Sequence, residues 1–206
     1  MKKKVVLATG NPGKVKEMQS QLEDFGYEVI AQSTYNFEEA VEDGLSFVEN
    51  ALIKARHACK YTGLPAIADD SGLEVDALQG APGIYSSRFA DGPSEHHRGD
   101  QANNTKLLNK LKGIEKRTAR FQCVIVYMEH ELDPTPIICE GTWEGSIANI
   151  EKGDFGFGYD PLFYVTDQQC HAAELDSKIK NKISHRAQAI DKLGQRLQSN
   201  NARTSH

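Results

Sequence analysis

The sequence has no apolar run long enough to cross a membrane as a helix. Such a helix needs about 20 predominantly apolar residues, whereas runs such as residues 5–8 are far shorter. This run follows a basic start at residues 1–4, where a signal peptide would need roughly seven to fifteen apolar residues. We therefore expect no membrane partner and a cytoplasmic location.

The sequence also has no excess of positive charge. It contains 24 Lys and Arg residues against 29 Asp and Glu residues, which gives a net charge of −5. Proteins that bind the phosphate backbone of nucleic acids usually carry a clear basic excess. We therefore expect no nucleic-acid partner, although a small anionic ligand is compatible with this composition because it needs only a local group of cations.

Cysteine is scarce and is not arranged for metal binding. The 4 cysteines, Cys59, Cys123, Cys139 and Cys170, are widely spaced and form no Cys-x-x-Cys pair. Zinc sites and dithiol redox sites normally show such close spacing. We expect all of these side chains in the core, since free Cys is among the most buried residue types.

The sequence does contain the pattern of an α/β protein. Its 39% hydrophobic and 26% charged residues are close to globular averages. In the first third of the chain, short apolar runs typical of strands alternate with apolar residues repeated every three to four positions, which is typical of helices. Strands are expected at residues 4–8, 27–31 and 66–68, and helices at residues 14–25 and 46–61. This alternation predicts a sheet flanked by helices.

The later part of the chain predicts an antiparallel addition to this sheet. Residues 120–128 and 137–148 are strand-like and are separated by a turn, so the sheet is expected to be mixed. A last helix is expected at about residues 184–197, followed by a frayed tail at residues 199–206. Because there is no linker or internal repeat, residues 1–198 are predicted to form one domain.

A long surface loop is expected at residues 80–99, which are rich in Gly, Pro and charged residues. Loops of this length in compact domains are usually functional or disordered. We interpret His96 and His97 within it as a solvated pair rather than as metal ligands.

The turn between the first expected strand and helix has features of an anion-binding site. It consists of Thr9, Gly10, Asn11, Pro12, Gly13 and Lys14. Unpaired N–H groups and the helix dipole favour an anion at a helix N-terminus, and Lys14 adds a positive charge. Pro12 lacks an N–H group and so removes one donor. The pattern predicts either a phosphate site or an ordinary tight turn with a solvated lysine.

Two adjacent carboxylates, Asp69 and Asp70, follow the third expected strand. Open α/β sheets bind ligands at the carboxyl ends of strands, and a hard cation would relieve the repulsion between the two groups. Mg²⁺ is held by one or two protein carboxylates together with substrate phosphates, and Glu42 or Asp43 could supply a further acid. The alternative is that residues 69–72 form a plain turn, which these residue types also favour.

Two later segments suit the binding of a nucleobase or a phosphate. Residues 153–161 combine flexible glycine backbone with aromatic rings, which can offer close main-chain approach and a stacking face. Lys180, His185 and Arg186 lie before and at the start of the last expected helix, where fixed donors can bind a carbonyl oxygen or a phosphate. The alternatives are aromatic core anchors and a solvated helix start capped by Ser184.

Several short segments of the sequence form an ordered set. They read Thr-Gly-Asn-x-Gly-Lys at 9–14, Ser-Phe-Val-Glu-Asn-Ala at 46–51, Ala-Asp-Asp-Ser-Gly-Leu at 68–73, Gly-Ala-Pro-Gly-Ile-Tyr-Ser at 80–86, Phe-Gly-Tyr-Asp-Pro at 157–161 and Ser-His-Arg at 184–186. Together they resemble the non-canonical purine nucleoside triphosphate pyrophosphatases, the dITP/XTP or inosine triphosphate pyrophosphatase family. The resemblance extends over roughly residues 3–197.

This resemblance implies an α/β (mixed α+β) fold with two lobes, a central mixed sheet with flanking helices, and a nucleotide cleft between the lobes. It implies hydrolysis of ITP, dITP and XTP to the nucleoside monophosphate and pyrophosphate, with Mg²⁺ as cofactor. Such an activity keeps these nucleotides out of DNA and RNA. The resemblance also implies a cytoplasmic homodimer that acts on a small-molecule substrate.

The resemblance also assigns roles to residues. Asp70 would be the catalytic acid-base residue and a Mg²⁺ ligand, with Glu42 and Asp69 as further acids for the metal. The substrate-binding residues would be Thr9, Gly10, Asn11, Pro12, Gly13, Lys14, Ser71, Phe157, Gly158, Tyr159, Asp160, Lys180, His185 and Arg186. In this set the N-terminal turn would hold phosphates, residues 157–160 would line the base and sugar, and His185 with Arg186 would meet the purine.

Two alternative functions are open at this stage. A related pyrophosphatase for modified pyrimidine or methylated nucleotides would share the phosphate turn and the acidic residues, but residues 184–186 favour a purine. A non-catalytic nucleotide-binding module would keep the turn and lose the carboxylates, so Asp69 and Asp70 favour an enzyme.

Overall fold

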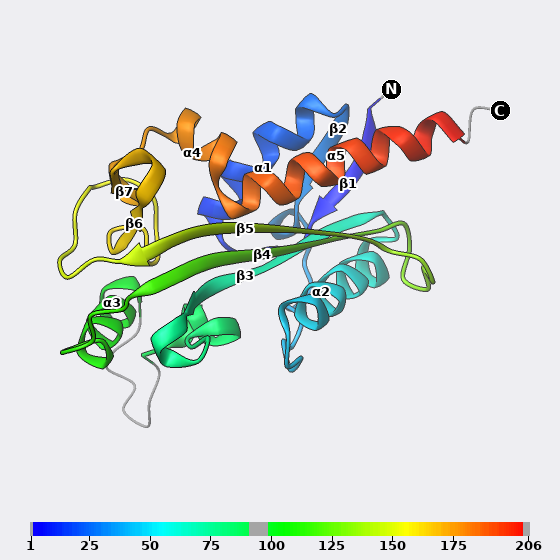
Figure 1. The fold of residues 1–206 in the computed structure, drawn as a ribbon. Helices are drawn as coiled ribbons and strands as arrows, with labels where there is room; N and C mark the ends of the chain where they lie inside the picture. The colour runs from blue at the N-terminus through cyan, green and yellow to red at the C-terminus, as the bar shows by residue number, and fades with distance from the viewer. Residues whose placement is uncertain (1, 91–98, 204–206) are drawn as a thin grey trace. The chain divides into compact units, whose positions relative to one another are not determined.

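The computed structural model describes residues 2–90 and 99–203 and has the α/β architecture that the sequence predicts (Figure 1). Within these residues the strands are β1 (Lys3–Leu7), β2 (Tyr27–Ala31), β3 (Ala66–Val75), β4 (Thr118–Met128), β5 (Ile137–Ile147), β6 (Phe163–Val165) and β7 (Cys170–His171). The α-helices are α1 (Pro12–Asp24), α2 (Phe47–Thr62), α3 (Asp100–Lys110), α4 (Ser177–Ile183) and α5 (His185–Arg203). The strands form a sheet in the order β2-β1-β3-β4-β5-β6-β7.

The sheet is mixed, as expected. β1 pairs in parallel with β2 and with β3, whereas β6 pairs antiparallel with β5 and with β7. β4 and β5 are neighbours joined by the expected turn. In the first part of the chain, α1 connects β1 to β2 and α2 precedes β3. The alternation predicted from apolar spacing is therefore confirmed.

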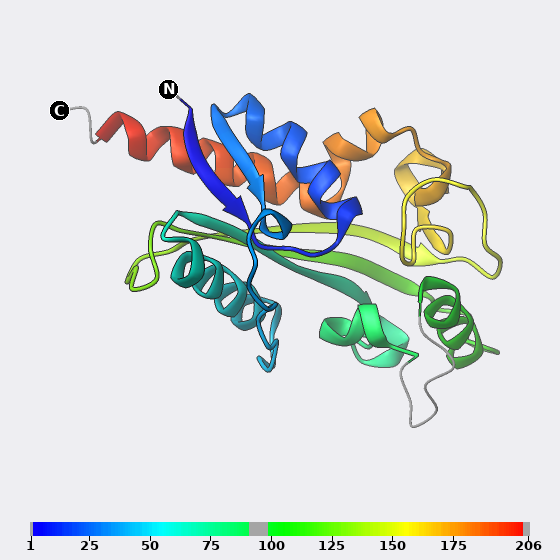
Figure 2. The same ribbon diagram turned by 180° about the vertical axis from the view of Figure 1, so that it is seen from behind.

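The chain divides into two compact units, of which the first has three layers. It comprises Met1–Asp70, Cys123–Gly141 and His185–His206. Within it, α1 and α5 cover one face of the sheet and α2 covers the other (Figures 1 and 2). Both faces of these strands are therefore buried.

Strand β1, which lies between β2 and β3, is packed on both sides. Val5 and Leu7 contact the cluster formed by α1 and α5, whereas Val6 contacts the cluster formed by α2. On α2 the buried residues Ala51 and Ala55 are small, which allows the helix to lie close to the sheet. Because alternate side chains of a strand point to opposite faces, successive residues are apolar where the strand is covered on both sides, as at residues 5–7.

The second unit has a separate core. It comprises Ser71–Gln122 and Thr142–Ser184. Aromatic rings lie at the centre of its core: the ring centroid of Phe163 is 4.6 Å from that of Phe121 and 5.3 Å from that of Trp143. β3, β4 and β5 each contribute residues to both units.

β3 is longer than the sequence predicts. A strand at residues 66–68 was expected, followed by a turn or a ligand site at residues 69–72, whereas β3 continues to Val75. The turn interpretation of residues 69–72 is therefore wrong. Charged side chains can continue a buried strand at this point because each one has a lysine partner on its own face of the sheet.

The last helix also differs from expectation. α5 continues to Arg203, so residues 199–203 are helical, and residues 204–206 lie outside the described residues. In the expected loop at residues 80–99, Gly83–Arg88 form a 3₁₀ helix. His96 and His97 lie outside the described residues.

The cysteines follow the expectation with one exception. Cys59, Cys123 and Cys139 are buried, whereas Cys170 is partly exposed, and all of these thiols are free. They therefore serve as small side chains in or beside the cores.

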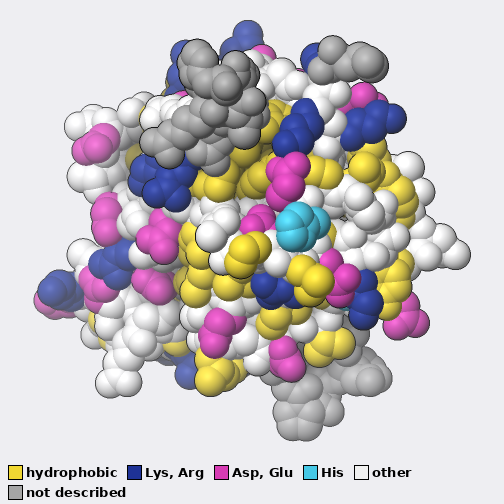
Figure 3. Space-filling view, turned by 90° about the vertical axis from the view of Figure 1, so that its right-hand side faces the viewer, with side chains coloured by type: hydrophobic (Ala, Val, Ile, Leu, Met, Phe, Trp, Pro, Cys, Tyr) yellow, Lys and Arg dark blue, Asp and Glu magenta, His cyan; other side chains and the backbone are white. Residues whose placement is uncertain are grey.

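The surface mixes charges of both signs. On the face drawn in Figure 3, Lys and Arg side chains lie among Asp, Glu and apolar side chains. No helix formed by residues 2–90 or 99–203 is both long and apolar enough to cross a membrane.

Candidate functional site

The turn between β1 and α1 is organised by its own side chains. Asn11 caps α1, and its Oδ1 accepts hydrogen bonds from the N–H groups of Gly13 and Lys14 at 2.9 and 3.2 Å. Thr9 Oγ1 accepts a hydrogen bond from the N–H group of Asn11 at 3.2 Å. Pro12 starts the helix, where its missing N–H costs nothing. Two N–H groups that we expected to face a phosphate thus already have an acceptor in Asn11.

Lys14 extends from this turn to a buried group of ionic side chains. Its Nζ lies 2.9 Å from Asp69 Oδ2, and Arg186 Nε lies 3.6 Å from the same oxygen. Arg186 also forms an ion pair with Glu17 on α1. Burial alone would raise the pKa of the Asp69 carboxyl, but Lys14 and Arg186 hold this pKa well below its ordinary value. Asp69 is therefore ionised at neutral pH and lies between two cations.

A second group lies around Asp70. Lys54 Nζ is 3.0 Å from Asp70 Oδ1 and 3.0 Å from Glu42 Oε2, and Asn50 Nδ2 donates to Asp70 Oδ2 at 3.2 Å. Of the acids considered before α2, Glu42 rather than Asp43 therefore contacts Lys54. Burial raises the pKa of Asp70, and the lowering by Lys54 does not fully offset this effect. Burial opposes the charge on Lys54, but Asp70 and the neighbouring acids keep the pKa of Lys54 above its ordinary value.

The loop that carries Glu42 is fastened to α2 by aromatic rings. The ring of Phe37 stacks on that of Tyr61 with centroids 5.2 Å apart and an interplanar angle of 11°. The ring of His57 lies 4.6 Å from that of Tyr61, and its Nε2 is hydrogen-bonded to the carbonyl oxygen of Glu38 at 2.7 Å. These contacts hold the loop beside the helix that supplies Lys54.

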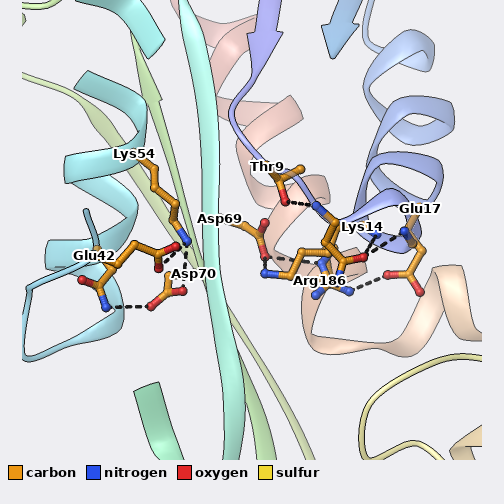
Figure 4. Close-up of polar contacts among 11 residues, drawn as sticks. Thr9, Lys14, Glu17, Glu42, Lys54, Asp69, Asp70 and Arg186 are labelled. Atoms are coloured by element: carbon orange, nitrogen blue, oxygen red, sulfur yellow. Dashed lines mark hydrogen bonds and ion pairs between the residues drawn. The ribbon is translucent and has the colours of Figure 1, made fainter. Parts of the chain in front are cut away.

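The two carboxylates of β3 lie on opposite faces of the strand. Figure 4 shows Asp69 directed toward Lys14 and Asp70 directed toward Lys54 and Glu42. Neighbouring side chains of a strand alternate in this way. The expectation that one cation lies between Asp69 and Asp70 is therefore wrong, because the sheet separates them.

The Asp70 side is the one that fits a divalent cation. Asp70 and Glu42 both contact the ammonium group of Lys54, so their oxygens already converge on a positive charge. Residues 2–90 and 99–203 contain no group of three or more His, Cys, Asp or Glu side chains placed to hold a metal. Mg²⁺ needs only one or two protein carboxylates when substrate phosphates complete its shell.

The second unit brings together another set of predicted residues. Lys180 Nζ lies 2.6 Å from Asp160 Oδ2 and 5.0 Å from the ring centroid of Phe157. The N–H group of Phe157 donates to Asp160 at 2.9 Å, and the N–H group of Gly158 donates to Asp100 at 2.6 Å. Asp160 thus fixes the position of a cation and of the backbone beside an aromatic ring.

The remaining predicted residues occupy varied positions. Tyr159 is buried and donates its hydroxyl to the carbonyl of Ser86 at 2.8 Å, which favours the core-anchor alternative for this ring. Ser71 follows Asp70 in β3 and is partly exposed. His185 is the buried first residue of α5, as expected for a residue at a helix start.

Our sequence analysis missed three residues of these groups: Lys54, Asn50 and Glu17. Asn50 and Lys54 are four positions apart on α2 and therefore share one face of the helix. Glu17 follows Lys14 by three positions on α1, which is also same-face spacing. Helical spacing from Lys14 was the signal that could have identified Glu17. Asn50 lies in the segment at 46–51 that carries the family resemblance, and helical spacing from it leads to Lys54.

Comparison with known proteins identifies the family of this chain. The model of the Ham1 family matches residues 5–196. The chain belongs to the Ham1 family. Among Ham1 relatives, a Photobacterium profundum protein named dITP/XTP pyrophosphatase is 59% identical over 192 residues, which cover 92% of this chain and 95% of that protein. A Vibrio vulnificus protein with the same name is 57% identical over 193 residues, covering 93% and 94%.

Solved Ham1 structures show the same fold. The structure of a HAM1 protein from Coxiella burnetii has a TM-score of 0.87 and 48% sequence identity, and the match covers 96% of this chain and 99% of that one. The α/β fold class and the family resemblance drawn from the sequence segments are thereby confirmed.

Proposed function

We propose that this Ham1-family protein hydrolyses dITP, XTP and ITP to the nucleoside monophosphate and pyrophosphate. The observation that carries the proposal is the buried carboxylate of Asp70, which faces Glu42 across the ammonium group of Lys54. This arrangement occurs in a chain that is 59% identical to a protein named dITP/XTP pyrophosphatase. Removal of such nucleotides from the pool would keep them out of DNA and RNA.

We assign Mg²⁺ to Asp70 and Glu42. When bound, the ion would supply neutralisation of the triphosphate charge and would favour ionisation of the attacking water. Lys54 lies where a positive charge is stabilised by both carboxylates. Asp69 was predicted as a further metal ligand from the sequence, and its observed neighbours, Lys14 and Arg186, favour a different role as their counter-ion.

The chain's own groups account for the remaining requirements of the reaction. Phosphoryl-type displacement depends on positioning and charge stabilisation rather than on a covalent intermediate. Lys14 and the capped turn at residues 9–13 would hold the phosphates. Asp70 would orient the attacking water and accept its proton.

We assign the nucleoside to the groups beside Asp160. The partly exposed ring of Phe157 offers a stacking face, and Lys180 lies close to it. His185 and Arg186 are proposed to meet the purine, because hypoxanthine and xanthine present a carbonyl oxygen that accepts from N–H donors. Arg186 also contacts Glu17 and Asp69, and Asp69 contacts Lys14. These contacts support a second role for Arg186, in which it positions Asp69 and thereby Lys14.

A nucleotide panel with product identification tests this function. Purified protein should convert dITP, ITP and XTP far faster than ATP, in a reaction that requires a divalent metal and releases pyrophosphate. Ion-exchange chromatography separates pyrophosphate from orthophosphate. Orthophosphate as the first product would refute attack at the α-phosphorus, and a preference for modified pyrimidine or methylated nucleotides would establish the alternative specificity.

The proposal includes properties that follow from the family resemblance. These are a cytoplasmic homodimer and a single domain with two lobes over residues 1–198. Light scattering during gel filtration measures the mass directly. A monomer at micromolar concentration would refute the dimer without affecting the proposed activity.

A further inference from the structure

Asn50 makes two hydrogen bonds that join Asp70 to the loop preceding α2. The residue lies one turn into α2 and is only 1% exposed. Its Oδ1 accepts from the N–H group of Gly44 at 2.9 Å, and its Nδ2 donates to Asp70 Oδ2 at 3.2 Å. A backbone N–H group can only donate and an ionised carboxylate can only accept, so the two partners determine which way the carboxamide points.

These bonds close a ring of contacts around the two carboxylates. Lys54 holds the other oxygen of Asp70 at 3.0 Å and also holds Glu42 at 3.0 Å. Glu42 lies two positions before Gly44, so the loop is tied to Asp70 by Lys54 at one point and by Asn50 at another. Both oxygens of the Asp70 carboxylate therefore have a donor.

The approach of the loop to Asn50 requires glycine at position 44. A Cβ atom on Gly44 would lie 2.7 Å from Asn50 Oδ1 and 2.6 Å from Glu49 Cβ, closer than real Cβ contacts. The loop backbone is thus packed directly against the carboxamide.

We infer that Asn50 is a positioning residue, which fixes the orientation of the Asp70 carboxylate and its separation from the loop that carries Glu42. This inference rests on the proposed function, in which Asp70 and Glu42 act together on the metal and the attacking water. A neutral amide suits the task because it donates to one carboxylate without neutralising it. Groups that orient a metal ligand or a base affect activity without touching substrate.

Two substitutions test the inference. Asn50→Ala removes both hydrogen bonds, whereas Asn50→Asp keeps an acceptor for the Gly44 N–H group and places an acceptor against Asp70. Both variants should lower kcat for dITP by about 10- to 100-fold, the usual range for loss of an orienting group. The KM should change by less than about threefold, because the substrate contacts stay in place.

Two readouts do not depend on turnover. In NMR hydrogen exchange, the Gly44 amide should exchange faster in Asn50→Ala and stay protected in Asn50→Asp. Mn²⁺ titration of the nucleotide-free protein, followed by electron paramagnetic resonance, should show weaker binding in Asn50→Ala. If Asn50→Ala does not fold, the kcat and amide exchange of Asn50→Asp decide the matter.

Asn103 provides a matched control in the second unit. It is 3% exposed, its Oδ1 accepts from the N–H group of Ala90 at 2.7 Å, and its Nδ2 donates to the carbonyl of Ser87 at 3.2 Å. Asn103→Ala removes the same kind of buried carboxamide and its two hydrogen bonds, and it should leave the Mn²⁺ affinity and the exchange rate of the Gly44 amide unchanged.

The outcomes separate the two hypotheses. A folded Asn50 variant with normal kcat would overturn the positioning role, and so would an equal loss of Mn²⁺ affinity in Asn103→Ala. If the wild-type protein does not hydrolyse dITP, the proposed function fails. In that case an unchanged Mn²⁺ affinity in Asn50→Ala would overturn the positioning role independently.

Discussion

Asp69 and Asp70 are neighbours in one strand but have opposite electrostatic surroundings. Burial opposes ionisation of both, yet two cations lower the pKa of Asp69, whereas for Asp70 the effect of burial is larger than that of Lys54 and the pKa is raised. The difference arises because β3 directs one side chain toward α1 and α5 and the other toward α2. Asp69 is thus suited to a structural role as a counter-ion, whereas Asp70 lies with Glu42 around Lys54 in the proposed site.

Asp70→Asn should lower kcat for dITP by at least about 100-fold, the usual scale for loss of an acid-base group. The change is nearly isosteric, so the far-UV circular dichroism spectrum should match that of the wild type. An unchanged kcat would show that Asp70 takes no part in the chemistry.

Asp69→Asn should act on stability. It removes the counter-charge that the partly buried Lys14 shares with the buried Arg186, which keeps its ion pair with Glu17, so the free energy of unfolding at neutral pH should fall by about 3 kcal/mol. Urea titrations measure this difference. A loss below about 1 kcal/mol would mean that the cations find other partners.

The same variant should alter the pH dependence of stability. The native pKa of Asp69 lies below its ordinary value of 3.8, so between the two values the unfolded chain binds more protons. The wild type should therefore lose stability as the pH falls from about 5 toward about 2, and Asp69→Asn should lose less. Asp70→Asn is the matched control. The native pKa of Asp70 is raised rather than lowered, so protonation of Asp70 favours the folded state as the pH falls. Removing Asp70 therefore cannot lessen the loss of stability at low pH.

At the scale of elements, the first turn of α5 depends on a close approach to β5. A Cβ atom on Gly141 would lie 1.9 Å from the carbonyl oxygen of His185 and 2.9 Å from the N atom of Ala189. The helix backbone therefore rests directly on the strand. This contact helps to place Arg186, the second residue of α5, beside Asp69.

Gly141→Ala should shift the start of α5 and lower the free energy of unfolding by about 1–3 kcal/mol, the typical cost of overpacking. Thermal unfolding followed by circular dichroism measures the change. Glu140→Ala, at an exposed neighbouring position of β5, is the control and should differ little from the wild type. Equal stability of both variants would show that α5 moves away without cost.

At the scale of the whole molecule, the two compact units share strands. β3, β4 and β5 each begin in one unit and end in the other. Each unit therefore contains only part of each of these strands. Separate unfolding would require these strands to break in their middle.

We therefore expect a single unfolding transition in urea. Trp143 is the only tryptophan and lies in the core of the second unit, whereas α1, α2 and α5 of the first unit contribute most of the helical signal. Tryptophan fluorescence and far-UV circular dichroism should therefore give coincident midpoints. Separated midpoints would show two independent domains and contradict the single domain predicted from the sequence.

The sequence was sufficient for features that depend on near neighbours. The apolar run before Thr9 predicted β1, and the apolar spacing within residues 14–25 and 46–61 predicted α1 and α2. These signals lie within a few positions of one another, where backbone preference and side-chain spacing act directly. They also supplied the ordered segments that resemble the family.

The partners of the buried charges were decided only by the tertiary structure. Spacing along the chain paired Asp69 with Asp70, whereas the packed sheet pairs Asp69 with Lys14 and Arg186. Arg186 also meets Glu17, which is 169 positions away. Periodicity reports which face of an element is apolar but not which helix covers that face. The identity of a buried cation's partner is therefore settled only when α1 and α5 pack on the same side of the sheet.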